Sequence, residues 1–309
     1  MKGLRLKEGM ALEMRLKELF NQYFYGRSGQ KDYTENDLPQ NRIQLFFQMA
    51  WSRAGELCKV NLLYLLCCFP AILWSVTNIL VVANGIERND FFVFLFYDVL
   101  PRYLIGLIPL VVITGPFNIA VNYVLRNWAR DEHAYLLTDF KDALKGNWKR
   151  GLLFGVMNGI VIILAFGCGR FYFAMTQKSS LFFVPLAVVG ILFILWSLCA
   201  MILPMMIATY GQRFSQILRN AALIVFVELP KAAAIRILRL APVIVAVVLA
   251  TLIPEYANWF FSILFALYAV IAMALSKFIA VSYANYACEK YLNIKIPGAK
   301  TDIGIHRKK

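Results

Sequence analysis

The chain has 309 residues, of which 60% are apolar and 16% are charged, and its mean hydropathy is +0.62. This composition supplies far too little polar surface to coat a soluble globule of this size. The formal net charge is +14, but it does not indicate a nucleic-acid binder, because Lys and Arg fall in blocks between apolar runs. The composition therefore predicts an all-α polytopic membrane protein whose main surroundings are the lipid bilayer.

The first 40 residues are polar and basic, and we interpret them as a cytoplasmic N-terminal arm. They contain no uninterrupted apolar run behind the basic residues, so a cleavable signal peptide is not expected. After Asn41 the apolar residues recur at helical spacing. This pattern predicts an amphipathic helix on the bilayer surface before the first span. Its predicted stripe consists of Ile43, Phe46, Phe47, Ala50, Ala54, Leu57 and Cys58.

Six apolar runs are long enough to cross a bilayer as helices. The first would extend about 39 Å, against a hydrocarbon thickness of roughly 30 Å. The Phe-rich segment 91–96 is too short to cross by itself, and we place it at the interface in an outer loop, 83–101. The membrane domain covers 41–292, and a basic tail, 293–309, follows it. The predicted spans are about 57–82, 102–125, 150–173, 181–210, 236–253 and 258–283.

The basic residues predict the orientation of the spans. Four of the 32 Lys and Arg residues fall in the connections or at the adjoining span ends on one side of the membrane, namely Arg88, Arg102, Arg170 and Lys178. All the others fall on the side that carries both chain ends. The positive-inside rule therefore predicts that the N- and C-termini are cytoplasmic.

Two connections between spans carry amphipathic segments. In the first, Leu136, Phe140, Leu144 and Trp148 recur every four residues beside basic residues, and the second runs from Phe214 to Val225 before Pro230. Both predict interfacial helices. Anchoring to the membrane surface is the simpler interpretation, and docking of a protein partner is the alternative. The first docking surface would consist of Asp131, Phe140, Lys141, Lys145, Trp148 and Lys149.

The residues Asp131, Glu132 and His133 come directly before the first amphipathic segment. They resemble a titratable cluster, but neighbours in sequence point in different directions on a helix. A helix N-terminus with acids at its positive end explains them more simply.

Within the spans, small and polar residues recur at intervals of four. Gly151, Gly155 and Gly159 predict close approach of a neighbouring helix. Thr114, Asn118 and Asn122 form a polar face on the second span, and in hydrocarbon such groups must find partners, water or a ligand. Interhelical hydrogen bonding to Asn61, Asn78 or Asn158 is one interpretation. A polar cavity face of Thr114, Asn118, Asn122 and Asn158 is the other.

Ionisable groups inside the spans are rare. Arg170 and Lys277 lie near span ends, where snorkelling to the headgroups is the ordinary explanation. No predicted span holds an Asp or Glu, which disfavours a proton pump built on carboxylates. The chain has two His residues and lacks HExxH, CxxC, GxSxG and Walker-type motifs. We therefore expect no metal site, no cofactor and no enzymatic activity, with an intramembrane enzyme as the least favoured function.

Several long strings resemble the YesL family of bacterial membrane proteins, a family of unknown function. They include TGPF, YVLRNWARDEHAY and DFKDALKGNWKRG, together with GRSGQKDYTENDLPQNRIQLFFQMAWSRAGELCKVNLLYLL further upstream. The resemblance implies a protein of the bacterial cytoplasmic (inner) membrane that is associated with carbohydrate uptake by ATP-binding-cassette transporters. The expected function is thus that of an accessory or transporter-associated component.

The alternative is that the chain is itself a solute transporter or a permease subunit. Permease subunits carry a cytoplasmic coupling segment with an EAA start, an Asp-Gly pair and a later LP. The segment NAALIVFVELP, residues 220–230, has the Ala pair and the LP but lacks the initial acid and the Asp-Gly pair. The permease-subunit alternative is therefore the weaker one.

Overall fold

The computed structural model describes residues 38–85 and 88–305, which form helices and no strand. Six helical runs are long and apolar enough to cross a membrane: Ala54–Asn84, Phe91–Ala129, Leu136–Thr176, Ser180–Thr209, Leu229–Leu252 and Pro254–Lys295. The predicted all-α class with six spans is confirmed. The predicted N-terminal arm lies outside the described residues except for its last positions.

The helical elements have the following bounds: α2 Arg42–Ser52, α3 Ala54–Asn84, α4 Phe91–Val93, η2 Phe94–Val99, α5 Leu100–Ala129, α6 Leu136–Thr176, η3 Ser180–Phe182, α7 Phe183–Thr209, α8 Phe214–Val227, α9 Leu229–Leu252, η4 Pro254–Tyr256, α10 Ala257–Leu267, η5 Tyr268–Ala272, α11 Met273–Tyr291 and η6 Asn293–Lys295.

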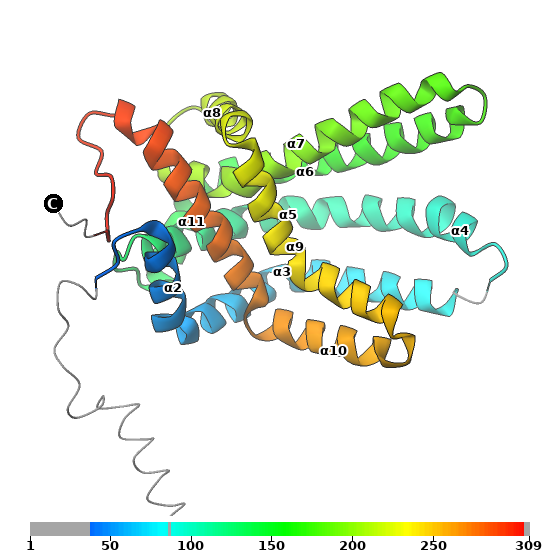
Figure 1. Cartoon of the computed structure of the whole chain (residues 1–309), viewed down its shortest axis with the longest axis horizontal. Helices are drawn as coiled ribbons and strands as arrows, with labels where there is room; N and C mark the ends of the chain where they lie inside the picture. Colours follow the sequence, from blue (N-terminus) through cyan, green and yellow to red (C-terminus); the bar gives the residue numbers. More distant parts are fainter. Residues whose placement is uncertain (1–37, 86–87, 306–309) are drawn as a thin grey trace, which may run out of the picture.

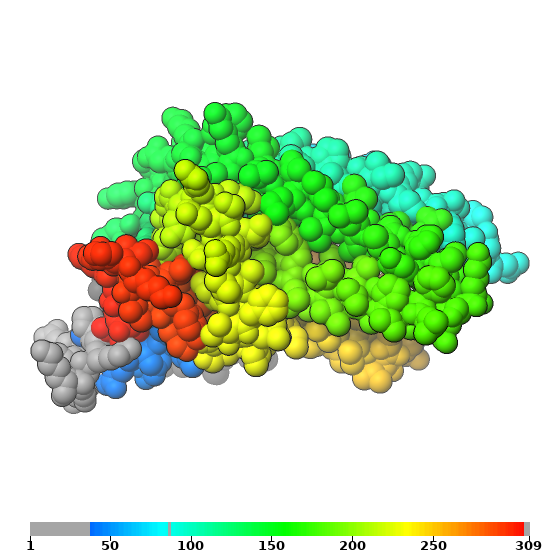
Figure 2. All heavy atoms as spheres, turned by 90° about the horizontal axis from the view of Figure 1, so that it is seen from above, coloured from blue at the N-terminus to red at the C-terminus, as the bar shows by residue number. Residues whose placement is uncertain are grey.

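The long helices converge at one end of the molecule and diverge toward the other (Figure 1). The α6–α7 hairpin, the α3–α5 pair and the α9–α10 pair form three arms. We call the convergent end, which holds α2, the turn at 130–135, α8 and the last turns of α11, the basic end. The opposite end is called the far end. Seen from above, α6, α7, α8 and α9 cover one face, and α11 reaches the basic end (Figure 2).

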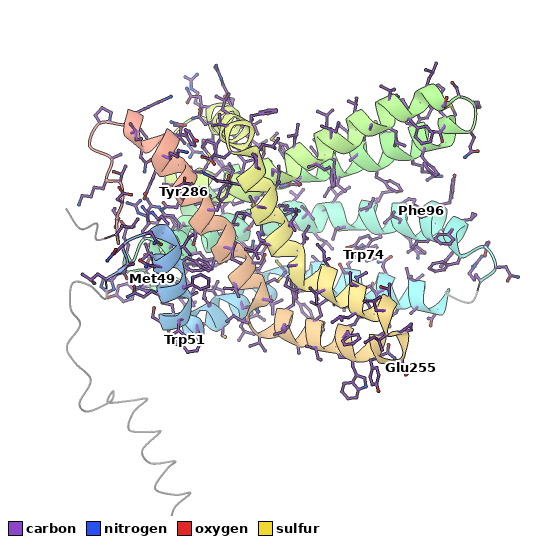
Figure 3. The ribbon with its side chains drawn as sticks, viewed as in Figure 1. Met49, Trp51, Trp74, Phe96, Glu255 and Tyr286 are labelled. Carbon is purple, nitrogen blue, oxygen red and sulfur yellow. The ribbon has the colours of Figure 1, made fainter. Side chains whose placement is uncertain are left out.

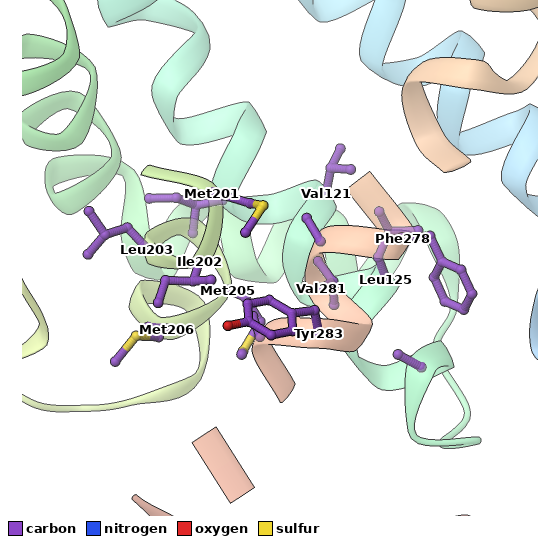
Figure 4. Close-up of a cluster of buried hydrophobic side chains, with 14 of the residues drawn as sticks. Val121, Leu125, Met201, Ile202, Leu203, Met205, Met206, Phe278, Val281 and Tyr283 are labelled. Carbon is purple, nitrogen blue, oxygen red and sulfur yellow. The ribbon is translucent and has the colours of Figure 1, made fainter. Parts of the chain in front are cut away.

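The hydrophobic core lies in the half of the bundle next to the basic end. Most of its largest fully buried side chains come from α5, α7 and α11, and Leu45 on α2 and Leu57 on α3 add to them. The close-up shows Val121, Met201, Met205, Phe278 and Val281 in this core (Figure 4). Toward the far end, most apolar side chains are exposed on the outside of the arms. In a bilayer, lipid chains would cover these surfaces.

Helices α5 and α6 pack backbone to backbone through glycines. A Cβ on Gly115 would lie 2.2 Å from the carbonyl oxygen of Gly151, and a Cβ on Gly151 would lie 2.5 Å from Cα of Pro116. Gly155 meets the backbone of Val112 in the same way, and Gly159 meets the side chain of Ile108. The predicted glycine series on α6 therefore lies directly against α5.

Two helices extend further than predicted. The Phe-rich segment, expected in an outer loop, begins the helical run Phe91–Ala129. The segment expected as a separate interfacial helix forms the first turns of α6, which is continuous over 41 residues. Pro101 lies in the first turn of α5, where proline is tolerated, and Gly151 lies inside α6, so neither residue interrupts its helical run. The expected loop and the expected first interfacial helix were therefore both wrong.

Helix α2 matches the predicted amphipathic segment only in part. The Asn41 side chain accepts a hydrogen bond from the backbone of Gln44 and caps the helix start. The predicted stripe is interrupted at Arg53, where α2 ends and α3 begins. The buried face is formed by Leu45 and Met49, which were not in the stripe. Trp51 projects outward with 86% of its surface exposed (Figure 3).

Helix α8 packs its predicted apolar stripe against the protein. Ile217, Ala221 and Val225 are buried beside α7, whereas Leu223 and Phe226 are exposed. The stripe therefore packs α8 against the core. Leu223 and Phe226 lie on the opposite side of the helix, where lipid would cover them.

Asp131, Glu132 and His133 do not cap a helix. Helix α6 begins at Leu136, and the side chain that accepts from the Tyr135 backbone is that of Asp139, at 2.7 Å. Asp131 has a positive φ of 55°, and its Oδ1 lies 3.8 Å from Nη2 of Arg53. Glu132 pairs with Arg126 and Arg130. Ion pairing in the turn, not helix capping, accounts for the two acids.

Asn61 stabilises a break in the last span. Its side-chain amide donates to the carbonyls of Tyr268 and Ala269, and its Oδ1 accepts from the backbone of Ala274. These groups border the π-helical turn η5, where the regular α-helical hydrogen bonds are interrupted. Asn61 therefore binds backbone of η5 and of the start of α11, not the polar face of α5.

Candidate functional site

A polar cavity of about 200 Å³ lies where five helices meet in the membrane domain. Its polar walls come from α5, α6, α9 and α11, and α7 adds an indole, a hydroxyl and apolar groups. We call it the cationic cavity. Its lining consists of Asn118, Asn122, Asn158, Ile162, Phe193, Trp196, Ser197, Ala200, Met201, Pro204, Arg236, Arg239, Lys277 and Ala280.

Asn118 is the central amide of this cavity. Its Oδ1 accepts from Lys277 Nζ and, at 2.9 Å, from Asn122 Nδ2. Among the described residues, no hydrogen bond uses the Asn118 amide nitrogen as a donor. Its two N–H groups therefore remain available to a ligand.

The four residues of the predicted polar face have different positions. Asn118, Asn122 and Asn158 line the cavity, whereas Thr114 donates to the carbonyl of Val111 on its own helix, at 3.1 Å, and lies outside the lining. Asn158 accepts a hydrogen bond from the Trp196 indole at 3.0 Å, which joins α6 to α7. The four residues of the predicted face therefore differ in their contacts. Asn158 connects helices, and Asn118 presents free donors.

Three basic side chains point into the same cavity. Arg239 donates through Nε to Ser276 Oγ at 3.0 Å, which leaves its terminal nitrogens without a partner among the described residues. Lys277 uses one of its three N–H bonds on Asn118, and its Nζ lies 4.2 Å from the centre of the Tyr64 ring. Arg236 makes no hydrogen bond to a described residue. The snorkelling expected of Lys277 is therefore wrong, because its ammonium turns inward to α3 and α5.

No described Asp or Glu pairs with these three cations. The ion pairs among the described residues lie at the basic end or in the far loop. Two like charges about 4 Å apart repel by roughly 4 kcal/mol at an effective dielectric constant of 20, so clustered unpaired cations are costly. Negative charge in the cavity would remove this repulsion. Its chemistry is therefore that of an anion-binding site.

Carboxylates at the basic end serve structure instead. Glu228, in the break between α8 and α9, is 4% exposed and accepts from Lys231 at 2.8 Å, Lys290 at 2.7 Å and the Tyr291 hydroxyl at 2.6 Å. These three donors lower the pKa of Glu228 to about 2. Glu289 pairs with Arg42 and accepts from Asn285. Both acids join α11 to its neighbours, and neither reaches the cationic cavity.

The predicted docking surface separates into a buried and an exposed part. Phe140 is 6% exposed and stacks on Phe117, with ring centres 6.5 Å apart. It belongs to the core, so its assignment to a docking surface was wrong. The helical rotation of α6 turns Phe140 toward α5 and leaves the others outside. The other five residues of the predicted docking surface are exposed at the basic end: Asp131, Lys141, Lys145, Trp148 and Lys149.

Arg236, Arg239 and Trp196 were not predicted as site residues. The two arginines were assigned to the boundary of the fifth span, but α9 begins at Leu229, so both lie within the helix. Their signal in the sequence was the run RILRLAPVIV, in which basic residues enter an apolar segment with no acid nearby. Among the described residues, no group of His, Cys, Asp and Glu could hold a metal ion.

Comparisons with known proteins identify one similarity. Residues 57–167 match the family model described as "Protein of unknown function, DUF624". This segment contains most of α3, all of α5 and most of α6, and therefore Asn118, Asn122 and Asn158, but not α9 or α11. No curated protein and no solved structure matches the chain.

Proposed function

We propose that this protein binds an anionic ligand inside the membrane as a non-enzymatic component of a transport process. The supporting observation is the cationic cavity, where Arg236, Arg239 and Lys277 meet Asn118 without a compensating carboxylate among the described residues. Guanidinium, ammonium and amide N–H groups are the donors that hold carboxylate and phosphate oxygens in proteins. Ionisable groups placed within membrane spans mark ligand and ion pathways more often than they serve packing.

Binding is favoured over catalysis by the kinds of groups present. Among the described residues, no carboxylate, imidazole or thiol lines the cavity. Acid–base and nucleophilic catalysis most often use such groups beside the reacting atoms. The amine of Lys277 and the hydroxyl of Ser197 line the cavity, but Lys277 donates to Asn118 and Ser197 donates to the carbonyl of Ile194. The cavity offers charge and hydrogen-bond donors, which are sufficient to hold a ligand.

Thermal unfolding of the purified full-length protein tests this proposal. A panel pairs each anionic compound with a neutral counterpart: glucuronate with glucose, and lysophosphatidic acid with monoacylglycerol. A ligand that binds the folded state raises the unfolding temperature. We expect an anionic member to raise the unfolding temperature, and we expect Arg239→Gln to reduce that rise. If no anion raises it, or if Arg239→Gln responds like the wild type, the proposal fails.

We further propose that the protein works in the bacterial cytoplasmic membrane beside a carbohydrate transporter of the ATP-binding-cassette type. This rests on the family resemblance and on the exposed surface of Lys141, Lys145, Trp148 and Lys149 at the basic end. An exposed Trp on a solvent-facing helix suits a protein partner, and the lysines around Trp148 would favour an acidic one. A solute transporter acting by itself is the alternative, and uptake by proteoliposomes that contain only this chain would favour it.

Affinity purification from native membranes tests the accessory role. We expect a carbohydrate permease to co-purify with the wild type. Trp148→Ala combined with Lys145→Glu should reduce its recovery, whereas Trp51→Ala, an exposed Trp on α2, should not. Recovery of the chain alone in mild detergent would contradict the accessory role.

A further inference from the structure

We infer that the anionic group in the cationic cavity belongs to an amphiphile, which reaches the cavity from the lipid between the helical arms. The inference rests on the proposed function, because it names the class of ligand for the same site. Three observations support it: the cavity is closed toward the basic end, its surroundings toward the far end are apolar and open, and its volume suits a headgroup.

The side toward the basic end is closed by the hydrophobic core. From the lining residue Met201 to Ile207, α7 has seven consecutive buried residues. Val121, Leu125 and Val281 face them from α5 and α11 (Figure 4). Between α5, α7 and α11, a polar solute from that side would have to pass a packed apolar layer.

The side toward the far end has no such layer. On α7, none of the described residues before Leu198 is buried, and Ile191, Leu192 and Ile194 are exposed. On α9, Ala246 is the one buried residue beyond Arg239 among those described. The α6–α7 and α9–α10 pairs diverge from the cavity toward the far end (Figure 1). The approach to the cavity is therefore a lateral one, between apolar helix surfaces.

The volume of the cavity limits what it can enclose. Pockets that bury a whole drug-sized ligand occupy about 300–1,000 Å³, whereas this cavity has about 200 Å³. A phosphate or carboxylate headgroup fits this space, and the rest of the molecule must remain outside. Ile162 and Phe193 line the cavity beside the polar groups and offer an apolar surface to the adjoining chain.

A matched set of probes separates the two halves of the ligand. The full-length protein in phosphatidylcholine nanodiscs is titrated with lysophosphatidic acid, which has a phosphate and a tail, with glycerol phosphate, which lacks the tail, and with monoacylglycerol, which lacks the phosphate. Bound molecules are counted by native mass spectrometry, and affinities follow from the titration. The cavity variants are Arg236→Gln and Arg239→Gln. The control variant replaces Lys141, Lys145 and Lys149 by Gln, which removes three cations outside the cavity.

We expect lysophosphatidic acid to bind at least tenfold more tightly than either half-probe. Each cavity variant should lower the affinity for lysophosphatidic acid by about tenfold or more, which is the effect of losing one charge-assisted hydrogen bond. The control should bind like the wild type. Arg236 makes no hydrogen bond to a described residue, so Arg236→Gln should fold normally. A loss of binding in this variant would then reflect the cavity and not misfolding.

The other outcomes overturn different statements. If glycerol phosphate binds as tightly as lysophosphatidic acid and the cavity variants weaken both, the ligand is a free anion, and only the amphiphile is excluded. If the cavity variants bind lysophosphatidic acid normally and the control does not, binding occurs at the surface. If no anionic probe binds, the anion site and the amphiphile are both wrong.

Discussion

Lys277 on α11 donates a hydrogen bond to Asn118 on α5, and its ammonium also faces the ring of Tyr64 on α3. One cation thus joins three helices that are far apart in the sequence. The contact orients the Asn118 amide so that its carbonyl oxygen is occupied and its N–H groups are free. Asn118 should therefore be a positioning and binding residue for an anion.

Asn118→Leu should lower the affinity for an anionic ligand by about tenfold, since it removes two N–H donors and leaves Lys277 without its acceptor. Titration with lysophosphatidic acid measures the effect. Asn147→Leu is the matched control, because Asn147 donates to the carbonyl of Ala143 on its own helix. Equal affinities of the two variants would show that Asn118 contributes no binding.

Gly151→Ala should destabilise the protein by about 2 kcal/mol, because the added methyl group would lie 2.5 Å from backbone of α5 and would separate the helices. Gly146→Ala, five residues earlier on α6, has nothing within 4 Å of the added methyl group. It should stabilise the helix by up to about 1 kcal/mol. Unfolding in denaturant measures the change in the free energy of unfolding for both variants. Changes of the same sign in the two variants would contradict the close packing at Gly151.

Asn61→Leu should lower the free energy of unfolding by about 3 kcal/mol. The substitution removes the side-chain partners of two carbonyls and one N–H at the π-helical turn η5. Asn78→Leu is the control, since Asn78 donates to the Trp74 carbonyl within its own helix. Its cost should remain below about 1 kcal/mol. Thermal unfolding in detergent compares them, and similar losses would argue that Asn61 has no special role at η5.

Glu228 should make the stability depend on pH in acid. Its folded pKa of about 2 lies below the ordinary value of 4.5, so the carboxylate stabilises the folded protein fully above about pH 4.5. That contribution is lost progressively as the pH falls from 4.5 toward 2. At neutral pH, Glu228→Gln should lower the unfolding temperature, and the difference from wild type should shrink in acid.

Glu56→Gln is the control for this titration, because Glu56 is a more exposed acid that pairs with Lys59 at 2.6 Å. Exposed ion pairs contribute about 0–1 kcal/mol. A Glu228→Gln difference that stays constant down to pH 2 would contradict the assigned role.

The sequence alone was sufficient where a property depends on one helix. The length of the apolar runs predicted six spans, and the spacing of Gly151, Gly155 and Gly159 predicted close packing on one side of α6. The cavity depends on how α9 and α11 are placed against α5, which spacing within a single helix does not reveal. Arg236 and Arg239 were therefore counted as boundary residues. Phe140 was misassigned because an amphipathic pattern does not say whether its apolar side meets lipid or protein.

The apolar layer of Met201, Met205 and Val281 also determines what this molecule does to the membrane around it. Ions cannot cross a close-packed hydrocarbon layer without losing their hydration at great cost. Vesicles that contain the protein should therefore keep a proton gradient as long as empty vesicles do. In a cell, the protein would therefore not dissipate the proton gradient across the membrane.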